Sequence, residues 1–120
     1  MTATARLSTV VLDTPDPAGL AAFYSALTGL PITERGEDWW QLGSDGGTPV
    51  AFQLAPEHVP PTWPGGERPQ QFHLDFTVDD LDDGERHAVD LGARKAEAQP
   101  GTTFRVFLDP SGHPFCLCVD

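Results

Sequence analysis

The chain contains the same order of predicted elements twice. A predicted helix from Asp16 to Gly29 has a counterpart from Asp80 to Gly92, and an offset of 64 residues aligns the two aspartates. Each aspartate is a favourable N-cap, and each glycine suits the end of a helix. One strand precedes each helix and three short strands follow it. This order predicts two βαβββ modules of about 60 residues each.

The clearest strand pattern covers residues 71–80, where apolar and polar side chains alternate. One face carries the apolar side chains, which are Phe72, Leu74, Phe76 and Val78. The other face carries His73, Asp75 and Thr77. Strict alternation is typical of a strand with one face against a hydrophobic core and one polar face. The polar face of this strand therefore becomes the first candidate for a functional site.

The other elements follow from periodicity and turn residues. In the first half we expect a strand at 7–13, a helix from 16 to 29 and strands at 31–35, 37–42 and 49–55. In the second half we expect a helix at 81–91 and strands at 93–98, 103–108 and 114–119. A proline-rich connector, residues 56–70, separates the halves and predicts a stiff excursion. The whole chain, 1–120, is then one domain made of module 1–55, connector 56–70 and module 71–120.

Charge and composition exclude several classes of partner. The formal net charge of −11 disfavours nucleic acid and anionic membrane surfaces, because both require clustered Lys and Arg. No apolar run approaches the roughly 18 residues of a membrane span, and no apolar region follows the N-terminus as in a signal peptide. The two cysteines, Cys116 and Cys118, are two positions apart in one predicted strand, where a disulfide would be strained. Free thiols fit a reducing compartment, so we expect a cytoplasmic protein.

Four stretches carry a resemblance to a known superfamily. They are residues 10–17 leading into 22–30, residues 71–81, residues 91–93, and Asp109-Pro110-Ser111-Gly112-His113-Pro114-Phe115-Cys116-Leu117. In this order and spacing the chain resembles the vicinal oxygen chelate superfamily, in the group of glyoxalase-like, bleomycin-resistance and extradiol dioxygenase proteins. The resemblance covers nearly the whole chain. It implies an α+β fold in which two βαβββ modules form a cup-shaped, partly open mixed β-barrel with flanking helices.

The resemblance also implies where ligands would lie. Metal-dependent relatives line the cup with four side chains, typically His, Glu or Gln, from the first and last strands of each module. In this chain the matching positions hold Thr9, Gln53, His73 and Cys116. His73 and Gln53 are the expected ligands if a divalent metal such as Zn, Mn, Ni or Fe binds. Thr9 and Cys116 replace the usual His and Glu, and threonine is a poor ligand for all of these metals.

Reasoning from the residues names five candidate contacts for a small molecule. Gln53, His73, Asp75 and Cys116 face away from the bulky apolar side chains of their strands, and Trp40 is the expected inward member of the Trp39–Trp40 pair. His73 is the candidate catalytic residue, because an imidazole can act as acid or base near neutral pH. Asp75, two residues further on, is expected about 6 to 7 Å from it and to act through an intermediary.

Two functions stay open at this point. The first is a lyase, isomerase or dioxygenase that binds a small organic molecule and uses His73, with or without a recruited metal. The second is a metal-free protein that binds or sequesters a drug-like molecule through Trp40, Gln53 and His73. The alternatives for Cys116 are strand packing, a soft metal ligand or a nucleophile. The resemblance further implies a homodimer.

Overall fold

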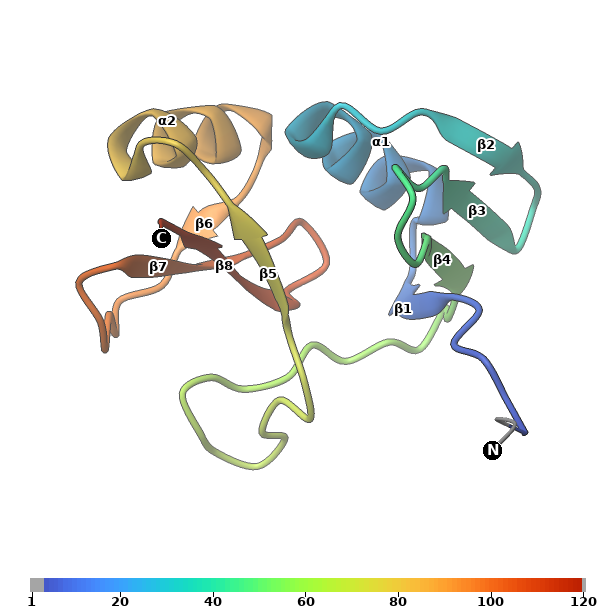
Figure 1. Ribbon diagram of the computed structural model, residues 1–120. Helices are drawn as coiled ribbons and strands as arrows, with labels where there is room; N and C mark the ends of the chain where they lie inside the picture. The colour runs from blue at the N-terminus through green and yellow to red at the C-terminus, as the bar shows by residue number, and fades with distance from the viewer. Residues whose placement is uncertain (1–3, 120) are drawn as a thin grey trace. The chain divides into compact units, whose positions relative to one another are not determined.

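The computed structural model describes residues 4–119, which form two units that divide between His58 and Val59 (Figure 1). Each unit holds one βαβββ module, so the predicted α+β fold and its internal repeat are confirmed. In the described residues no helix is both long enough and apolar enough to cross a membrane. The joining of the modules into a cup stays a prediction.

The first module is a four-stranded mixed sheet with one helix. Its elements are β1 (Val10–Thr14), α1 (Pro17–Thr28), β2 (Ile32–Arg35), β3 (Trp39–Leu42) and β4 (Val50–Leu54). The strand order is β1-β4-β3-β2, with β1 and β4 parallel and the other pairs antiparallel. Strand β1 begins at Val10, later than the predicted residue 7, because its partner strand begins opposite at Val50.

Helix α1 begins and ends where its capping residues predict. Asp16 Oδ1 accepts a hydrogen bond from Gly19 N at 3.0 Å, and Pro17 occupies the first turn. Gly29 ends the helix with a φ of 78°, a left-handed conformation that a residue without Cβ adopts readily. The helix covers one face of the sheet, and the Tyr24 ring stacks on Phe52 with centroids 5.7 Å apart. This helix-covered face forms the core of the first module.

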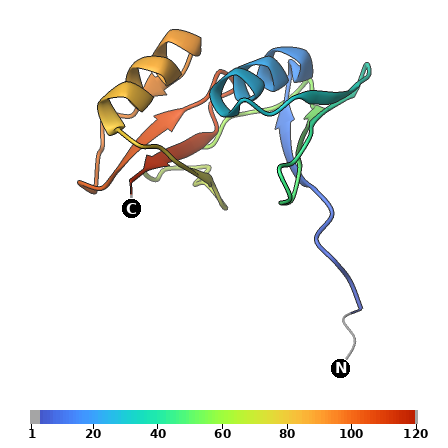
Figure 2. The same ribbon diagram turned by 45° about the horizontal axis from the view of Figure 1, so that its top comes forward.

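The second module repeats this topology. Its elements are β5 (Leu74–Thr77), α2 (Leu81–Leu91), β6 (Arg94–Lys95), β7 (Phe104–Leu108) and β8 (Pro114–Cys118). The order is β5-β8-β7-β6, again with the first pair parallel. Asp80 caps α2 by accepting from Asp82 N and Asp83 N, and Gly92 ends it, as predicted. Figure 2 shows α2 lying over one face of its sheet.

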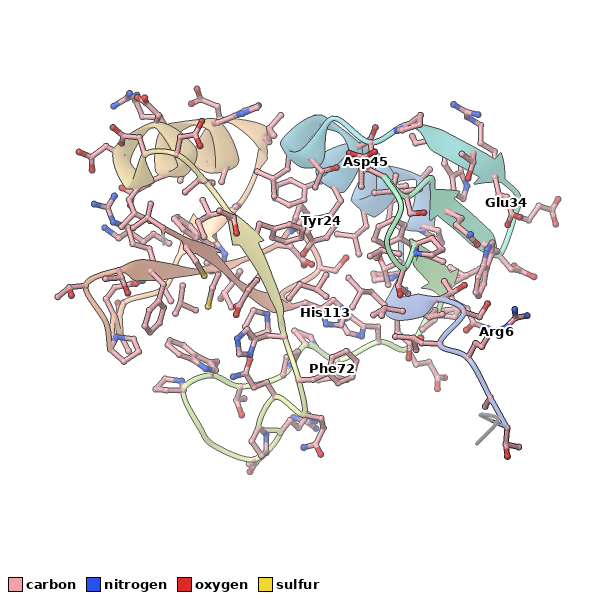
Figure 3. All side chains as sticks on the ribbon, in the orientation of Figure 1. Arg6, Tyr24, Glu34, Asp45, Phe72 and His113 are labelled. Atoms are coloured by element: carbon pink, nitrogen blue, oxygen red, sulfur yellow. The ribbon has the colours of Figure 1, made fainter. Side chains whose placement is uncertain are left out.

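Two strands of this module are shorter than predicted. Strand β5 begins at Leu74, so Phe72 is not held in the core and is 62% exposed (Figure 3). Strand β6 has two residues because the Gln99 side chain enters the ladder beyond Lys95: its amide oxygen accepts from Val106 N at 2.9 Å, and its amide nitrogen donates to Ala96 O at 2.9 Å. Of the next pair of backbone hydrogen bonds, the one from Ala96 N to Val106 O remains at 3.0 Å, and the side-chain amide replaces the other.

Arg105 of β7 joins the sheet to α2. Its guanidinium lies 2.9 Å from Asp82 Oδ1 and 3.1 Å from Glu85 Oε1, both on the helix. Because side chains alternate along a strand, Arg105 and its register partner Leu117 face the helix, whereas Cys116 faces the other way. The face of the second sheet opposite α2 is therefore left to line a cavity.

Candidate functional site

The face of the second sheet opposite α2 brings together residues that are far apart in the sequence. In the parallel pair of β5 and β8, Asp75 lies opposite Cys116 and Thr77 lies opposite Cys118. Across the antiparallel pair of β7 and β8, Cys116 also lies opposite Val106. Residues directly opposite each other in neighbouring strands present their side chains on the same face. Asp75, Cys116 and Val106 therefore form one row across the sheet.

A cavity of about 300 Å³ lies over this row. All of its lining residues belong to the second unit, and they are Trp63, Gln70, His73, Asp75, Pro100, Phe104, Val106, Pro114, Cys116 and Cys118. Its volume is at the small end of the range for protein ligand pockets, and its walls are mostly apolar. It can hold a small organic molecule.

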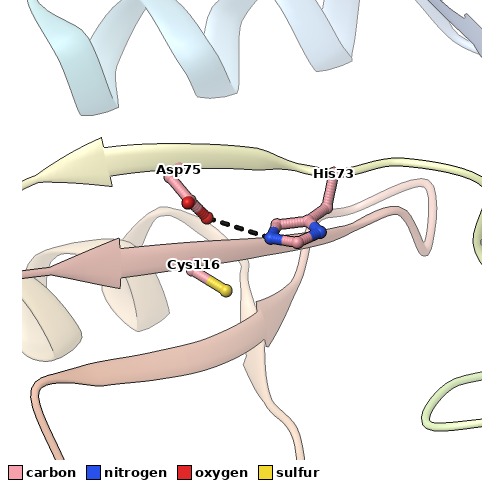
Figure 4. A group of neighbouring side chains, drawn as sticks. All are labelled: His73, Asp75 and Cys116. Carbon is pink, nitrogen blue, oxygen red and sulfur yellow. Dashed lines mark ion pairs between the residues drawn. The ribbon is translucent and has the colours of Figure 1, made fainter.

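Three side chains form a polar cluster at this cavity (Figure 4). His73 Nε2 lies 3.0 Å from Asp75 Oδ1, and one ligand atom each of His73, Asp75 and Cys116 lie within 4.8 Å of one another. The expectation that Asp75 acts on His73 through an intermediary is wrong. His73 lies just before β5, so its ring can turn along the strand and contact the carboxylate directly.

The surroundings of Cys116 keep its thiol protonated. Burial is the largest cause that raises the pKa of Cys116 from about 9 to about 12, and the charge of the Asp75 carboxylate and a hydrogen bond to it contribute the next largest parts of that rise. A thiolate, not a thiol, is the nucleophile in cysteine chemistry. At neutral pH this residue is therefore a neutral partner of Asp75, and these surroundings do not favour its action as a nucleophile.

Gln70 contributes a polar atom that no sequence pattern singles out. Among the described residues, its Oε1 is a buried side-chain oxygen without a hydrogen-bond partner. Gln70 lies near the end of the connector and lines the cavity. A buried acceptor without a partner costs free energy, because it has lost its hydrogen bonds to water. A ligand that donates a hydrogen bond would remove that cost.

The connector supplies one wall of the cavity through Trp63. A bridge between Thr62 and Pro69, with a hydrogen bond from Arg68 N to Thr62 Oγ1 at 3.0 Å, closes the connector into a loop. Pro60 lies directly against Gly112 of the turn before β8. From Val59 onward the proline-rich connector is therefore part of the second unit, and Trp63 and Gln70 of it line the cavity.

Two predicted residues of the first module do not line this cavity. Gln53 is an exposed residue of β4 that lies opposite Asp13 and Trp39. Thr9 precedes β1, with its hydroxyl 3.3 Å from that of Ser8. The described cluster of nitrogen, oxygen and sulfur donors thus consists of His73, Asp75 and Cys116, whereas the sequence paired His73 with Gln53. Such donors suit zinc, provided that the thiol loses its proton.

The predicted orientation of the tryptophan pair is wrong. Trp39 lies opposite Gln53, so it is Trp39 that shares the face of Gln53. Its indole Nε1 donates to Gln41 Oε1 at 3.1 Å. Trp40 lies opposite Phe52, which has no exposed surface, and the Arg35 guanidinium lies 5.7 Å from the Trp40 ring centroid. Alternation alone does not fix the register between β3 and β4. That register decides which tryptophan shares the face of Gln53 and which shares the face of Phe52.

Two βαβββ modules, each with one helix on a mixed sheet, place the chain in a class of α+β proteins, and the comparisons with known proteins place it more closely. The family model described as "Glyoxalase-like domain" matches residues 9–118. The chain therefore belongs to the glyoxalase-like domain family. The resemblance seen in the sequence is confirmed. No curated protein sequence matches the chain.

Solved structures show the same fold. A glyoxalase/bleomycin resistance protein/dioxygenase family enzyme from Burkholderia phytofirmans PsJN has a TM-score of 0.75 and 24% identity, covering 96% of this chain and 98% of its own. A glyoxalase-related enzyme from Fulvimarina pelagi has a TM-score of 0.71 and 20% identity over 96% and 88%. A bleomycin resistance determinant encoded on transposon Tn5 has a TM-score of 0.62 and 23% identity over 97% and 98%.

Proposed function

We propose that this glyoxalase-like protein binds a small organic molecule in the cavity of its second module. The observation that carries the proposal is the cavity itself, which combines apolar walls with the His73–Asp75–Cys116 cluster. Binding sites for small molecules commonly join an apolar lining to a few convergent polar groups. Trp63 and Phe104 supply flat surfaces, and Asp75 supplies a charged acceptor.

His73 is the residue best suited to act on a bound molecule. When its Nε2–H donates to Asp75, a neutral imidazole keeps its lone pair on Nδ1 and can accept a proton there. The Asp75 carboxylate, 3.0 Å away, holds the ring in this orientation. Proton transfer of this kind fits a lyase or isomerase, and the same contacts without proton transfer fit a binding or sequestering protein.

A cavity-filling variant tests the proposal. We would screen organic amines, carboxylic acids and neutral aromatic compounds by ligand-observed NMR against the wild type, Val106→Phe and Val89→Phe. Val106 is buried under the cavity, whereas Val89 is 46% exposed on α2 and serves as the control. Binding that Val106→Phe abolishes and Val89→Phe preserves supports the proposal. An absence of binding, or equal binding by both variants, contradicts it.

A metal-dependent function is a second candidate, which the three-donor cluster favours. Around a tetrahedral zinc ion, neighbouring donor atoms lie about 3.5 Å apart, so donors within 4.8 Å need only small rotations. Because the Cys116 thiol must lose its proton, zinc binding should release a proton and strengthen as pH rises.

Equilibrium dialysis against Zn²⁺ tests this second candidate. About one equivalent should bind to the wild type and to Cys118→Ala, and less than a tenth as tightly to Asp75→Ala or Cys116→Ala. Equal zinc binding by all four proteins would exclude the cluster as a metal site. The same series with Mn²⁺, Ni²⁺ and Fe²⁺ would rank the metals.

A further inference from the structure

Two side chains of the cavity lining, Gln70 and Asp75, carry hydrogen-bond acceptors. Gln70 Oε1 is buried without a partner among the described residues, and the Asp75 carboxylate is a second acceptor at the same cavity. Of the described residues that line the cavity, none is Lys or Arg. A ligand that brings its own acceptors would leave Gln70 Oε1 unpaired, whereas a ligand with N–H groups would satisfy it.

The charge of the cavity points in the same direction. Asp75 is the carboxylate in the lining, and its side chain is 60% exposed and so available to a ligand. The Cys116 thiol does not add a second negative charge at neutral pH, but it also does not neutralise Asp75. The only cationic group among the lining residues would be His73, when protonated. The formal net charge of −11 adds a field that attracts cations and repels anions.

The walls complete the description of the ligand. Trp63 and Phe104 present aromatic rings to the cavity, and Pro100 and Pro114 add rigid apolar surface. Aromatic faces attract cations as well as apolar groups. A molecule that joins a flat apolar body to a positively charged nitrogen therefore matches both parts of the lining. The cavity volume of about 300 Å³ limits that molecule to a small one.

We propose that the second-module cavity selects a small organic ammonium compound, with its N–H groups donated to Gln70 Oε1 and its charge near Asp75. This inference rests on the proposed function, because it names the class of molecule that the cavity takes. It predicts discrimination against carboxylates of the same size and shape, which would face Asp75 and find no Lys or Arg among the described residues of the lining to pair with.

Four probes of similar shape test the inference. Calorimetry, with EDTA present to exclude metals, would compare 2-phenylethylamine, 2-phenylethanol, 3-phenylpropanoate and phenyltrimethylammonium. The amine should bind at least about tenfold more tightly than the alcohol, and the propanoate should be the weakest. The trimethylammonium probe keeps the charge but has no N–H group. Its affinity should therefore fall when Asp75 is replaced and should not change when Gln70 is replaced.

Substitutions at three positions, Asp75, Asp90 and Gln70, locate the contacts. Asp75→Asn should weaken the amine about tenfold and leave the alcohol unchanged, whereas Asp90→Asn, which removes an exposed charge on α2, should alter neither. Gln70→Leu should weaken the amine and leave phenyltrimethylammonium unchanged. Thermal unfolding of each variant verifies that it is folded. If Gln70→Leu is unstable, Gln70→Glu tests the same contact, because it should strengthen amine binding.

The outcomes separate the inference from the proposed function. If 3-phenylpropanoate or the alcohol binds as tightly as the amine, and Val106→Phe abolishes that binding, the ammonium inference is overturned while the proposed function stands. If Asp75→Asn and Asp90→Asn weaken the amine equally, the attraction is a property of net charge, and the inference is again overturned. If no probe binds to the wild type, the inference fails, and the wider screen against Val106→Phe decides the proposed function.

Discussion

Asp75 of β5 lies directly opposite Cys116 of β8, and the carboxylate faces the buried thiol. The two residues are 41 positions apart in the sequence, and the parallel pairing of their strands brings them together. The pair has an electrostatic consequence, because a carboxylate beside a thiol opposes the formation of a second negative charge. The same carboxylate contacts His73 on its other side, at 3.0 Å.

The raised pKa of Cys116 predicts how stability depends on pH. Because the folded-state pKa of about 12 lies above the ordinary value of about 9, folding favours the protonated thiol. This contribution is fully present below about pH 9 and is lost as pH rises toward about 12. The difference in unfolding free energy between the wild type and Cys116→Ala should therefore shrink over that interval in urea titrations. A difference that stays constant from pH 8 to 11 would contradict the assignment.

Replacing Asp75 should lower the pKa of the Cys116 thiol only in part. Asp75→Asn removes the negative charge, but burial is the larger cause of the shift and remains. In a Cys118→Ser background, the thiolate absorbance near 240 nm should then appear at a lower pH than with Asp75 present. Asp90→Asn provides the control for net charge. An unchanged titration in Asp75→Asn would show that the carboxylate does not act on this thiol.

Asp109 should be important for stability although it is remote in sequence from the candidate site residues of β5. Its carboxylate is 2% exposed and accepts hydrogen bonds from Ser111 N at 2.9 Å and His113 N at 3.0 Å. Asp109→Ala removes both and should lower the unfolding free energy by about 2 to 4 kcal/mol. Asp109→Asn keeps one acceptor oxygen and should cost less. Chemical denaturation of the three proteins measures the difference, and equal midpoints would contradict this role.

Gly112 should stabilise the protein by letting the turn before β8 pack closely against Pro60 of the connector. Its φ is +88°, and a Cβ added there would lie 2.4 Å from Pro60 Cβ. Gly112→Ala should therefore lower the unfolding free energy by about 1 to 3 kcal/mol through backbone strain and displacement of Pro60. Gly65→Ala is a matched control within the connector, because a Cβ there meets nothing within 4 Å. Thermal unfolding compares the two, and equal losses would contradict this account.

Local sequence patterns predicted the bounds of the helices closely, and they predicted part of the candidate site. The N-caps Asp16 and Asp80 and the C-terminal glycines Gly29 and Gly92 bound the helices, as the sequence indicated. Alternation correctly placed His73, Asp75 and Cys116 on the face away from the bulky apolar residues of their strands. It could equally have identified Cys118 and Phe104, which are register partners on the cavity face. Trp40 was assigned to the wrong face because either register of β3 satisfies the local pattern.

The sequence by itself determined the repeat and the helices, since caps, periodicity and turn residues act over a few neighbouring positions, and its resemblance to known proteins indicated the glyoxalase-like family. Only the tertiary structure decided the composition of the site. The pairing of β5 with β8 sets Asp75 against Cys116, and the folding of the connector brings Gln70 and Trp63 to the same cavity. Both depend on contacts between residues far apart in the chain, whose register local propensity does not encode.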